Sequence, residues 1–306
     1  MAISNFNPTI WSKAYLYNLS KRHVFADVMN RDYQGEIRAA GDTVKINSIG
    51  RVTVKAYTRN AGMGGTAAAP TVAAIERPEI EQGSSLFLTI SESDYFNIGL
   101  SDADAYQQRP KLMNAKMKEA AYGMANAVDL FCNETLQTGV SGTGDNTGNR
   151  LTARTIGTGA GDDDAYETLV DLGIKLREAD VYGDYWVIVP PWFIGMLQKD
   201  VRFTNYGTGP NRETLTNGKI GRAAGFDIKE SNNLSGATSG TLATVGGVYT
   251  ILAGVKEAAT YADQIDKVEA FRPPDGFTDA VKGLHMYGAK VTRPYALASV
   301  ACTQAT

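Results

Sequence analysis

The feature that most constrains the fold is a long stretch with little side-chain bulk, set between two patterns typical of β-strands. Apolar residues alternate with polar ones at Val44 and Ile46 before it, and at Leu86 and Leu88 after it, as in half-buried strands. Residues 61–70 read Ala-Gly-Met-Gly-Gly-Thr-Ala-Ala-Ala-Pro, with no charge and too little apolar bulk to form a core. Loops longer than about 12–15 residues are uncommon inside compact domains and are usually functional or disordered. The pattern therefore predicts two extended legs that carry an irregular tip away from the body.

The residues after the legs predict a long amphipathic helix from Lys111 to about Gln137. Its apolar positions, spaced mostly by three or four residues, form one stripe made of Met113, Met117, Ala120, Met124, Ala127, Val128 and Phe131. At 1.5 Å per residue such a helix is on the order of 40 Å long. A shorter helix is expected before it, capped by Ser101 or Asp102.

The second half of the sequence alternates helix and strand signals. One helix is predicted over residues 164–179, and another begins at Pro190-Pro191, because proline suits the first turn of a helix. Strands are predicted at residues 185–189, 248–253, 268–271 and 284–291. The chain as a whole is therefore expected to belong to the α+β class.

The composition argues against several classes of function. The 30 basic residues are balanced by 33 acidic ones, for a formal net charge of −3, whereas proteins that grip a phosphate backbone usually carry a basic patch. Cys132 and Cys302 stand far apart and form neither a disulfide framework nor a CxxC metal motif. No signal peptide is recognised, and no apolar run reaches the roughly 18 residues of a membrane span. We therefore expect synthesis in a cytoplasm and no membrane partner.

No pattern in the sequence points to a catalytic, cofactor-binding or metal site. The two histidines, His23 and His285, stand in no catalytic motif and are expected to be structural. The glycines at 157–161 lack the GxGxxG spacing of a nucleotide loop, and the Gly-Lys pair at 218–219 lacks the hydroxyl residue of a P-loop. The three acids at 162–164 are better explained as a helix start than as metal ligands.

Several short segments follow one another in an informative order, from an N-terminal arm through the loop and the long helix to the mixed second half. They read Phe-Asn-Pro-Thr-Ile-Trp-Ser at 6–12, Asn-Arg-Asp-Tyr-Gln-Gly-Glu-Ile at 30–37, Gly-Asp-Thr-Val at 41–44, Gln-Gln-Arg-Pro at 107–110, Glu-Ala-Ala-Tyr-Gly-Met-Ala at 119–125, Tyr-Trp-Val-Ile-Val-Pro-Pro at 185–191, Gly-Phe at 225–226 and Val-Lys-Gly-Leu-His-Met-Tyr-Gly at 281–288. In this order they resemble the major capsid (coat) proteins of tailed double-stranded DNA bacteriophages, which have the HK97-like fold.

The resemblance implies an HK97-like capsid fold in four parts. Residues 1–40 would form an N-terminal arm with a short helix, and 41–92 an extended β-hairpin loop with strand legs. Residues 93–150 would form a peripheral domain with the long spine helix, and 151–306 a mixed α/β axial domain with return strands to the peripheral domain.

The resemblance also implies a function and its partners. The chain would self-assemble, as hexamers and pentamers, into an icosahedral capsid that encloses double-stranded DNA without sequence-specific binding. A separate scaffolding protein and a portal would take part, with assembly in the host cytoplasm and the virion capsid as the final location. No cofactor and no enzymatic activity are expected.

The candidate subunit-interface residues lie in the arm and in the loop, whose limits we set at residues 51–84. The resemblance implies that this loop reaches over a neighbouring subunit. The candidates are Trp11, Lys55, Tyr57, Arg59, Met63, Pro70 and Arg77. Some relatives join subunits by a lysine–asparagine bond, for which Lys55, Asn126 and Asn133 supply the residue types. Because nothing in the sequence fixes their geometry, no crosslink is expected.

Two other interpretations remain open at the level of sequence. A nanocompartment shell protein of the encapsulin type would share the fold and would enclose a cargo protein instead of DNA. An α/β enzyme or ligand-binding domain with an unusual insertion would account for the second half, and its turnover would depend on His285.

Overall fold

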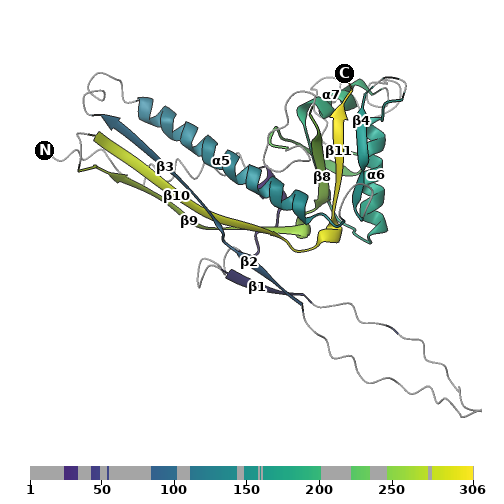
Figure 1. Ribbon diagram of the computed structural model, residues 1–306, viewed down its shortest axis with the longest axis horizontal. Coiled ribbons are helices and arrows are strands. Elements are labelled where there is room, and N and C mark those ends of the chain that lie inside the picture. Colours follow the sequence, from purple (N-terminus) through teal and green to yellow (C-terminus); the bar gives the residue numbers. More distant parts are fainter. Residues whose placement is uncertain are drawn as a thin grey trace, which may run out of the picture.

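Two units make up the described part of the chain, an elongated helix-on-sheet unit and a six-stranded unit, and a β-hairpin leaves the place where they meet (Figure 1). The computed structural model describes residues 24–33, 43–48, 54, 84–101, 111–142, 148–157, 159, 161–200, 222–234, 247–274 and 278–305. The arm through residue 23, with its predicted short helix, and most of the predicted loop lie outside these ranges.

The length of a single helix, α5, determines the length of the elongated unit. α5 (Lys111–Gly139) has 29 residues and is therefore about 43 Å long. The strands beside it, β9 (Ala259–Phe271) and β10 (Thr278–Val291), have 13 and 14 residues and extend about 43–46 Å. Helix and strands run along one another (Figure 1), and the long helix predicted from the apolar stripe is confirmed.

The sheet of the elongated unit is antiparallel, with the order β3-β10-β9. β3 (Glu92–Ser101) was not predicted. The short helix expected after Ser101 or Asp102 lies outside the described residues. α5 covers one face of this sheet. The side chains that meet there are Met117, Ala121, Met124 and Ala125 from α5, and Phe96, Ile98, Val268 and Val281 from the three strands.

The six-stranded unit is a mixed sheet with the order β4-β11-β8-β5-β7-β6. β11 pairs antiparallel with β8 and parallel with β4. β5 and β8 are covered on both faces, which explains their nearly continuous apolar sequences. The elements of the unit are β4 (Arg150–Ile156), α6 (Ala165–Glu178), β5 (Tyr185–Val189), α7 (Pro191–Lys199), β6 (Arg222–Ala223), β7 (Phe226–Glu230), β8 (Tyr249–Val255) and β11 (Leu297–Gln304).

Local chemistry explains where the two helices of this unit begin. The Asp164 side chain caps α6 by accepting a hydrogen bond from the Tyr166 N–H at 3.0 Å, as expected for the acids at 162–164. Pro191 opens α7, as predicted. Both helices pack on one face of the sheet, where Leu172 and Phe193 are completely buried.

The other face of the six-stranded sheet meets the C-terminal half of α5 in what we call the junction core. The short helix α2 (Phe25–Val28) inserts into the same core. The N-terminal segment is therefore held where the two units meet. The buried side chains of the junction core include Phe25, Val28, Val128, Cys132, Leu136, Trp186, Ile188, Leu252, Tyr261, Tyr287 and Leu297.

The predicted strand legs pair with each other. β1 (Thr43–Ser48) and β2 (Ser84–Thr89) are antiparallel, with Thr43 opposite Thr89 and Ser48 opposite Ser84. Their apolar side chains pack on Met286 of β10. Because Ser48 and Ser84 are partners, the chain between them leaves and returns at one point. We call β1 and β2 together the hairpin base.

In the second half of the chain, the predicted helices and strands were of the correct type, but some were too short and some strands were not predicted. The helix at 164–179 and the strands at 185–189 and 248–253 are confirmed with small shifts of their ends, and the strand at 284–291 is confirmed but begins six residues earlier, at Thr278. The strand predicted at 268–271 begins at Ala259, nine residues earlier, after the short 3-10 helix η1 (Lys256–Ala258). A second 3-10 helix, η2 (Pro294–Ala296), precedes β11. β4, β7 and β11 were not predicted.

Gly288 of β10 is required for the close approach of β2. A Cβ atom at this position would collide with the backbone carbonyl of Thr89, and backbone yields less readily than a side chain. We expect Gly288→Ala to lower the free energy of unfolding by about 1–3 kcal/mol through overpacking, measured by urea denaturation of the isolated subunit.

Gly123 of α5 is the matched control for this substitution. It is exposed, and a Cβ there would meet nothing within 4 Å. We expect Gly123→Ala to raise stability by about 0.5–1 kcal/mol. Unchanged stability in Gly288→Ala would mean that β2 does not press on β10 at this point.

Candidate functional site

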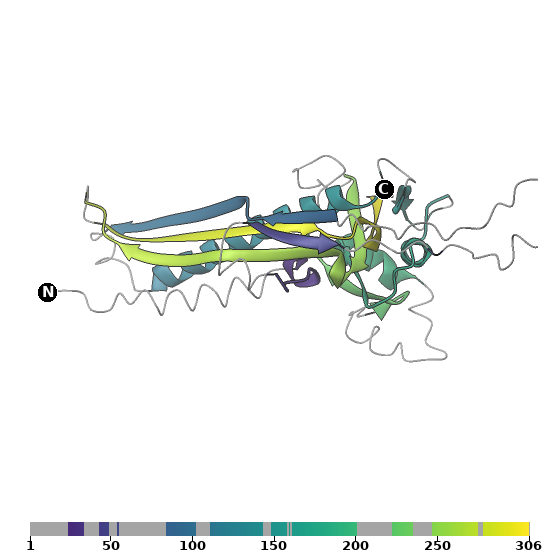
Figure 2. The same ribbon diagram turned by 90° about the horizontal axis from the view of Figure 1, so that it is seen from below.

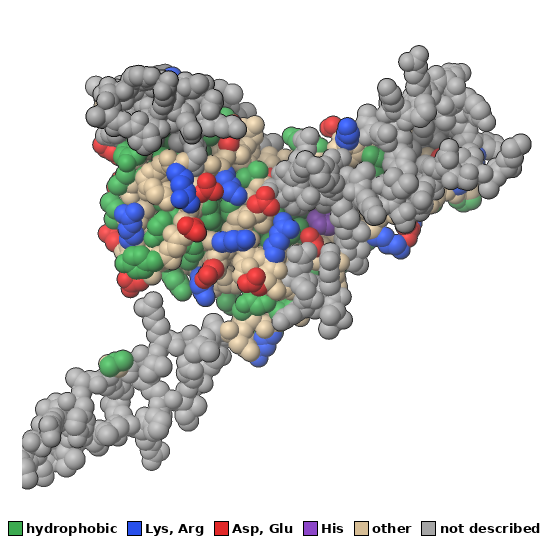
Figure 3. Space-filling view, turned by 180° about the vertical axis from the view of Figure 1, so that it is seen from behind, with side chains coloured by type: hydrophobic (Ala, Val, Ile, Leu, Met, Phe, Trp, Pro, Cys, Tyr) green, Lys and Arg blue, Asp and Glu red, His purple; other side chains and the backbone are tan. Residues whose placement is uncertain are grey.

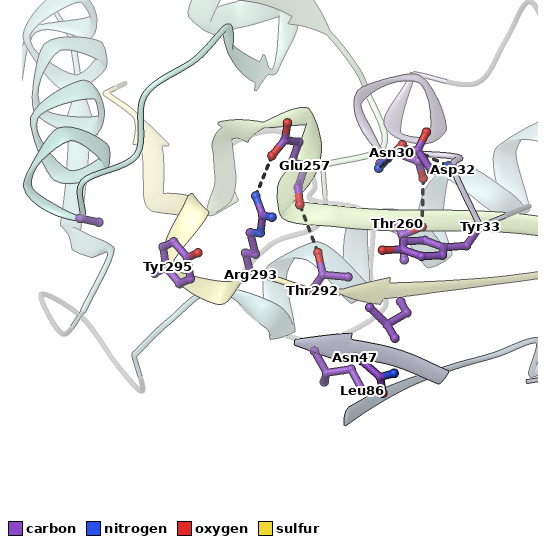
Figure 4. A pocket seen from close by; sticks show the side chains of 12 residues that line it. Asn30, Asp32, Tyr33, Asn47, Leu86, Glu257, Thr260, Thr292, Arg293 and Tyr295 are labelled. Atoms are coloured by element: carbon purple, nitrogen blue, oxygen red, sulfur yellow. Dashed lines mark hydrogen bonds and ion pairs between the residues drawn. The ribbon is translucent and has the colours of Figure 1, made fainter. Parts of the chain in front are cut away.

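A groove of about 1020 Å³ lies beside the hairpin base (Figure 4). Ile46, Asn47 and Leu86 of the hairpin base line one side of it. Arg293 and Glu257, from the turns that precede β11 and β9, line another. The groove therefore touches the hairpin base, the elongated unit and the six-stranded unit at once.

The N-terminal segment closes the groove by pairing with the start of β9. The Asn30 N–H donates to the Ala259 carbonyl, and the Tyr261 N–H donates to the Asn30 carbonyl, both at 2.9 Å. The Asn30 side chain donates to Asp32 Oδ2 at 2.7 Å and accepts from the Asp32 N–H at 3.1 Å. These bonds fix a tight turn at one end of the groove (Figure 4).

An ion pair and a side-chain hydrogen bond stabilise the opposite side of the groove. Arg293 Nη1 lies 2.6 Å from Glu257 Oε2, and the Thr292 hydroxyl donates to the Ala258 carbonyl at 3.1 Å. Both groove carboxylates, Asp32 and Glu257, are thus engaged. The described lining holds no His, Cys or Ser, and its polar groups belong to Asn, Thr, Tyr, Arg, Asp and Glu side chains.

A second surface lies on the three-stranded sheet, on the face opposite α5 (Figure 2). Tyr95 of β3 and Leu284 of β10 are direct cross-strand partners, and they are 77% and 37% exposed. Glu269 forms ion pairs with Lys267 and Lys282 beside them. These residues surround a hollow of about 330 Å³, which we call the open sheet face.

The open sheet face has the composition of a protein-binding surface. An aromatic and an aliphatic side chain form its centre, and charged side chains form its rim. The hydrogen bond from Lys267, followed by that from Lys282, lowers the pKa of the Glu269 carboxyl. The Glu269 carboxyl therefore stays ionised at neutral pH, while Tyr95 and Leu284 offer apolar area to a partner.

The seven predicted interface residues lie outside the described residues, so their contacts stay predictions: Trp11, Lys55, Tyr57, Arg59, Met63, Pro70 and Arg77. His23 lies outside them as well. Asn133, one of the two asparagines weighed for a crosslink, is buried, and its amide donates to the Asn233 carbonyl at 2.8 Å. Its amide group is thus engaged within its own subunit.

The open sheet face was missed because β3 was missed. Phe96 and Ile98 alternate with polar residues, which was the available signal for a strand. By the same alternation Tyr95 lies on the other face of the sheet. The pairing of Tyr95 with Leu284 could not be read from local sequence.

Burial removes the imidazole of His285, in β10 of the elongated unit, from solvent. His285 is 1% exposed, and burial lowers its pKa against the opposing effect of Asp263 and Asp94. Its neighbour Tyr287 donates to Asp94 Oδ2 at 2.6 Å. An imidazole so enclosed cannot reach a substrate in solution, and its position is that of a structural histidine.

The described residues show no exposed cysteine and no cluster of metal-binding side chains. Cys132 and Cys302 are both buried, and burial raises the pKa of the Cys302 thiol to about 12. Within the described ranges, no three His, Cys, Asp or Glu side chains gather closely enough to hold a metal ion. No helix in that part of the chain is long and apolar enough to cross a membrane.

Comparison with known proteins gives a consistent result. The family model described as "Phage capsid protein" matches residues 94–300. The solved structure of Mycobacterium phage Che8 is 25% identical, with a TM-score of 0.67 over 91% of this chain and 90% of that one. The capsid structure of the cyanophage P-SCSP1u is 13% identical, with a TM-score of 0.61 over 87% and 84% of the two chains.

A virus-like particle from Pyrococcus furiosus shares the fold more distantly. It is 11% identical, with a TM-score of 0.52 over 95% of this chain and 98% of that one. No curated protein matched the sequence. The neighbours share an HK97-like fold, which confirms the predicted fold class.

The buried His285 yields a prediction about pH. Its folded-state pKa lies below the ordinary value of 6.5, so the unfolded chain binds the proton more tightly. Wild-type stability, measured relative to His285→Gln, should therefore fall as the pH drops below about 6.5. Urea denaturation of both proteins between pH 7.5 and 5 measures the difference.

The other histidine supplies the control. His23→Gln removes one imidazole and leaves His285 in place, so this variant should keep the wild-type pH profile. A difference between wild type and His285→Gln that stays constant over this range would show that burial does not shift the pKa of His285.

Proposed function

The chain belongs to the phage capsid protein family and is a structural subunit of a multi-copy phage shell, and from this premise we propose how it joins its neighbours. The extended loop, residues 51–84, lies over an adjacent subunit and binds it. The hairpin base anchors this loop, and the open sheet face receives the loop of another copy. The observation that carries the proposal is the pairing of Ser48 with Ser84.

Because of that pairing, the two ends of the loop are attached to the body side by side, at one place. Both legs start from a two-stranded base packed on β10 through Ile46, Leu88 and Met286. Val54, just beyond the base, is 93% exposed. A loop of this length, whose tip at residues 61–70 has too little apolar bulk to form a core, gains stability by contact with something outside its own body.

The open sheet face fits the loop tip by composition. The tip, residues 61–70, carries no charge, so it can cover Tyr95 and Leu284 without burying an unpaired ion. The paired charges at Lys267, Glu269 and Lys282 then stay at the rim. Each copy gives a loop and receives one, which is a head-to-tail contact able to close a ring.

The predicted interface residues fit the same scheme. Lys55, Tyr57, Arg59, Met63, Pro70 and Arg77 lie on the loop, and Trp11 on the arm. We propose that these side chains contact neighbouring copies within hexamers and pentamers. The four parts at 1–40, 41–92, 93–150 and 151–306 then serve as arm, loop, peripheral domain and axial domain.

The charge distribution supports enclosure of DNA without tight binding. Positive and negative side chains are interspersed over the six-stranded unit (Figure 3), and the formal net charge is −3. Proteins that hold a phosphate backbone concentrate basic residues on one surface. We propose double-stranded DNA as the content of the shell, a scaffolding protein and a portal as partners, and the host cytoplasm as the place of assembly.

The alternatives have weaker support. The Pyrococcus furiosus particle resembles the chain less closely than the phage structures do, so the nanocompartment interpretation is not favoured over a phage capsid. Family membership assigns a structural role in place of the proposed α/β enzyme or ligand-binding domain.

Deletion of residues 58–75 tests the role of the loop. Residues 61–70 within this segment have too little apolar bulk to form a core, so we expect the variant to fold with an unchanged circular dichroism spectrum. Shell assembly should be lost, measured by negative-stain microscopy and sedimentation. A Gly-Ser linker of equal length in place of residues 58–75 separates sequence from length, and normal particles from the deletion would contradict the proposal.

Tyr95 tests the receiving surface. Truncation of a central interface aromatic typically costs about 2 kcal/mol or more, so Tyr95→Ser should raise the concentration needed for assembly by roughly tenfold or more. The subunit should keep its stability, because this side chain is largely exposed. Tyr182→Ser, at an equally exposed tyrosine of the six-stranded unit, is the control. Assembly of Tyr95→Ser at wild-type concentration would sink this assignment.

A further inference from the structure

Three connections between described elements join the elongated unit to the six-stranded unit. They run from α5 to β4, from β8 to β9 and from β10 to β11. They lie beside the junction core, at the end of α5 that meets the six-stranded unit (Figure 1). We call this place the joint. The connections are bonded to one another as well as packed against the core, and membership of a shell does not by itself explain those bonds.

A single residue, Asn149, ties the first connection to the third. It is 8% exposed, and its side-chain amide donates to the Tyr295 carbonyl at 2.6 Å and to the Leu297 carbonyl at 3.0 Å. Its backbone takes part as well, because the Asn149 N–H donates to the Ser141 carbonyl and the Asn149 carbonyl accepts from the Ser299 N–H, both at 3.1 Å. The residue just before β4 is therefore bonded to the chain that leaves α5 and to the chain that enters β11.

The next residue, Arg150, holds the end of α5 from the side of the six-stranded unit. Its Nη2 donates to the Gln137 carbonyl at 2.7 Å, and its Nε donates to the Gly142 carbonyl at 3.0 Å. The last four carbonyls of a helix have no partner within the helix, and the helix dipole favours a cation near that end. The first side chain of β4 thus stabilises the end of the long helix.

Backbone bonds join the remaining connection to the same set. The N–H groups of Thr292 and Arg293 both donate to the Ala258 carbonyl, at 2.9 and 3.0 Å. These bonds link the connection from β8 to β9 with the connection from β10 to β11. The Ser141 N–H donates to the Pro294 carbonyl at 3.2 Å, which adds a second link to the chain that leaves α5. All three connections therefore form one bonded set, with the connection from β10 to β11 in the middle.

Apolar packing and directed bonds constrain the joint in different ways. Hydrophobic attraction is non-directional, so the junction core alone would keep the two units in contact over a range of angles. Hydrogen bonds weaken steeply as they bend away from a straight line, and a buried amide that loses its partners is unfavourable. The bonds of Asn149 and Arg150 reach from the start of β4 to the end of α5. A rotation of one unit against the other therefore distorts these bonds.

We propose that Asn149 and Arg150 form a clasp that limits the angle between the two units to a narrow range, and that this range selects the size of the shell. The proposal rests on the role of the chain as a shell subunit and is independent of how the loop binds a neighbour. Repeated contacts close into one assembly when each copy is rotated against the next by the same amount. Copies with a wider range of angles close into shells of several sizes.

Distances between spin labels on the two units test the clasp in the full-length, unassembled subunit. One label is attached through Asn97→Cys on β3 and the other through Glu167→Cys on α6, at two exposed positions. The native Cys132 and Cys302 are buried and stay unlabelled. Without further changes we expect one narrow distance distribution by double electron–electron resonance. In Arg150→Met the distribution should broaden by roughly twofold or more, as for a hinge that has lost a constraint.

A second variant and a control make the result specific. Asn149→Ala removes the other half of the clasp and should broaden the same distribution, while Arg150→Met carries the test alone where Asn149→Ala does not fold. Ile251→Val removes a methylene from the core beneath α6 and α7, so it should lower the urea midpoint and leave the distribution narrow. A narrow distribution in Arg150→Met, or equal broadening in Ile251→Val, would overturn the clasp.

Particle diameters measured by negative-stain microscopy test the link to shell size. Wild-type chains and Ile251→Val should give particles of one diameter, and Arg150→Met should give more than one. Particles of the wild-type diameter alone from Arg150→Met, when its label distribution is broad, would show that the angle does not select the size. Deletion of residues 58–75 should leave the label distances of the subunit narrow, so a failure of the loop proposal and a failure of the clasp are read separately.

Discussion

The junction core decides the shape of the molecule, because both units bury their apolar surface against the same side chains there. Phe25, Val128 and Leu252 come from three distant parts of the chain, and each is completely buried in this core. Burial of such a side chain contributes about 1.5–3 kcal/mol. The exposed ion pair between Arg293 and Glu257, at the groove, contributes about 0–1 kcal/mol. Packing in the junction core therefore contributes more than surface ion pairs to holding the two units together.

Elements with a pattern of their own could be predicted from the sequence, whereas elements defined by a distant partner could not. The apolar stripe of α5 and the alternation in β1 and β2 are local signals, and they predicted these elements correctly. β3 was missed because its place is set by pairing with β10, a strand far along the chain. β4 and β11 pair in parallel although about half of the chain lies between them in sequence. No local pattern predicts such a pair.

The candidate interface likewise has one part that the sequence predicts and one part that it does not. Low complexity between two strand patterns located the loop, because a chain without core-forming residues must find its contacts elsewhere. The surface that we propose receives the loop could not be derived, since Tyr95 and Leu284 become neighbours through sheet register alone.

The matched lengths of α5, β9 and β10 have a mechanical consequence. One stiff beam about 43 Å long is joined to the six-stranded unit at one end, through the C-terminal half of α5. A rotation of about 5° at that joint displaces the far end of the beam by about 4 Å, by simple leverage over this helical length. Small adjustments in the core are thus amplified at the periphery. Identical subunits can then follow surfaces of different curvature without altering any element of their fold.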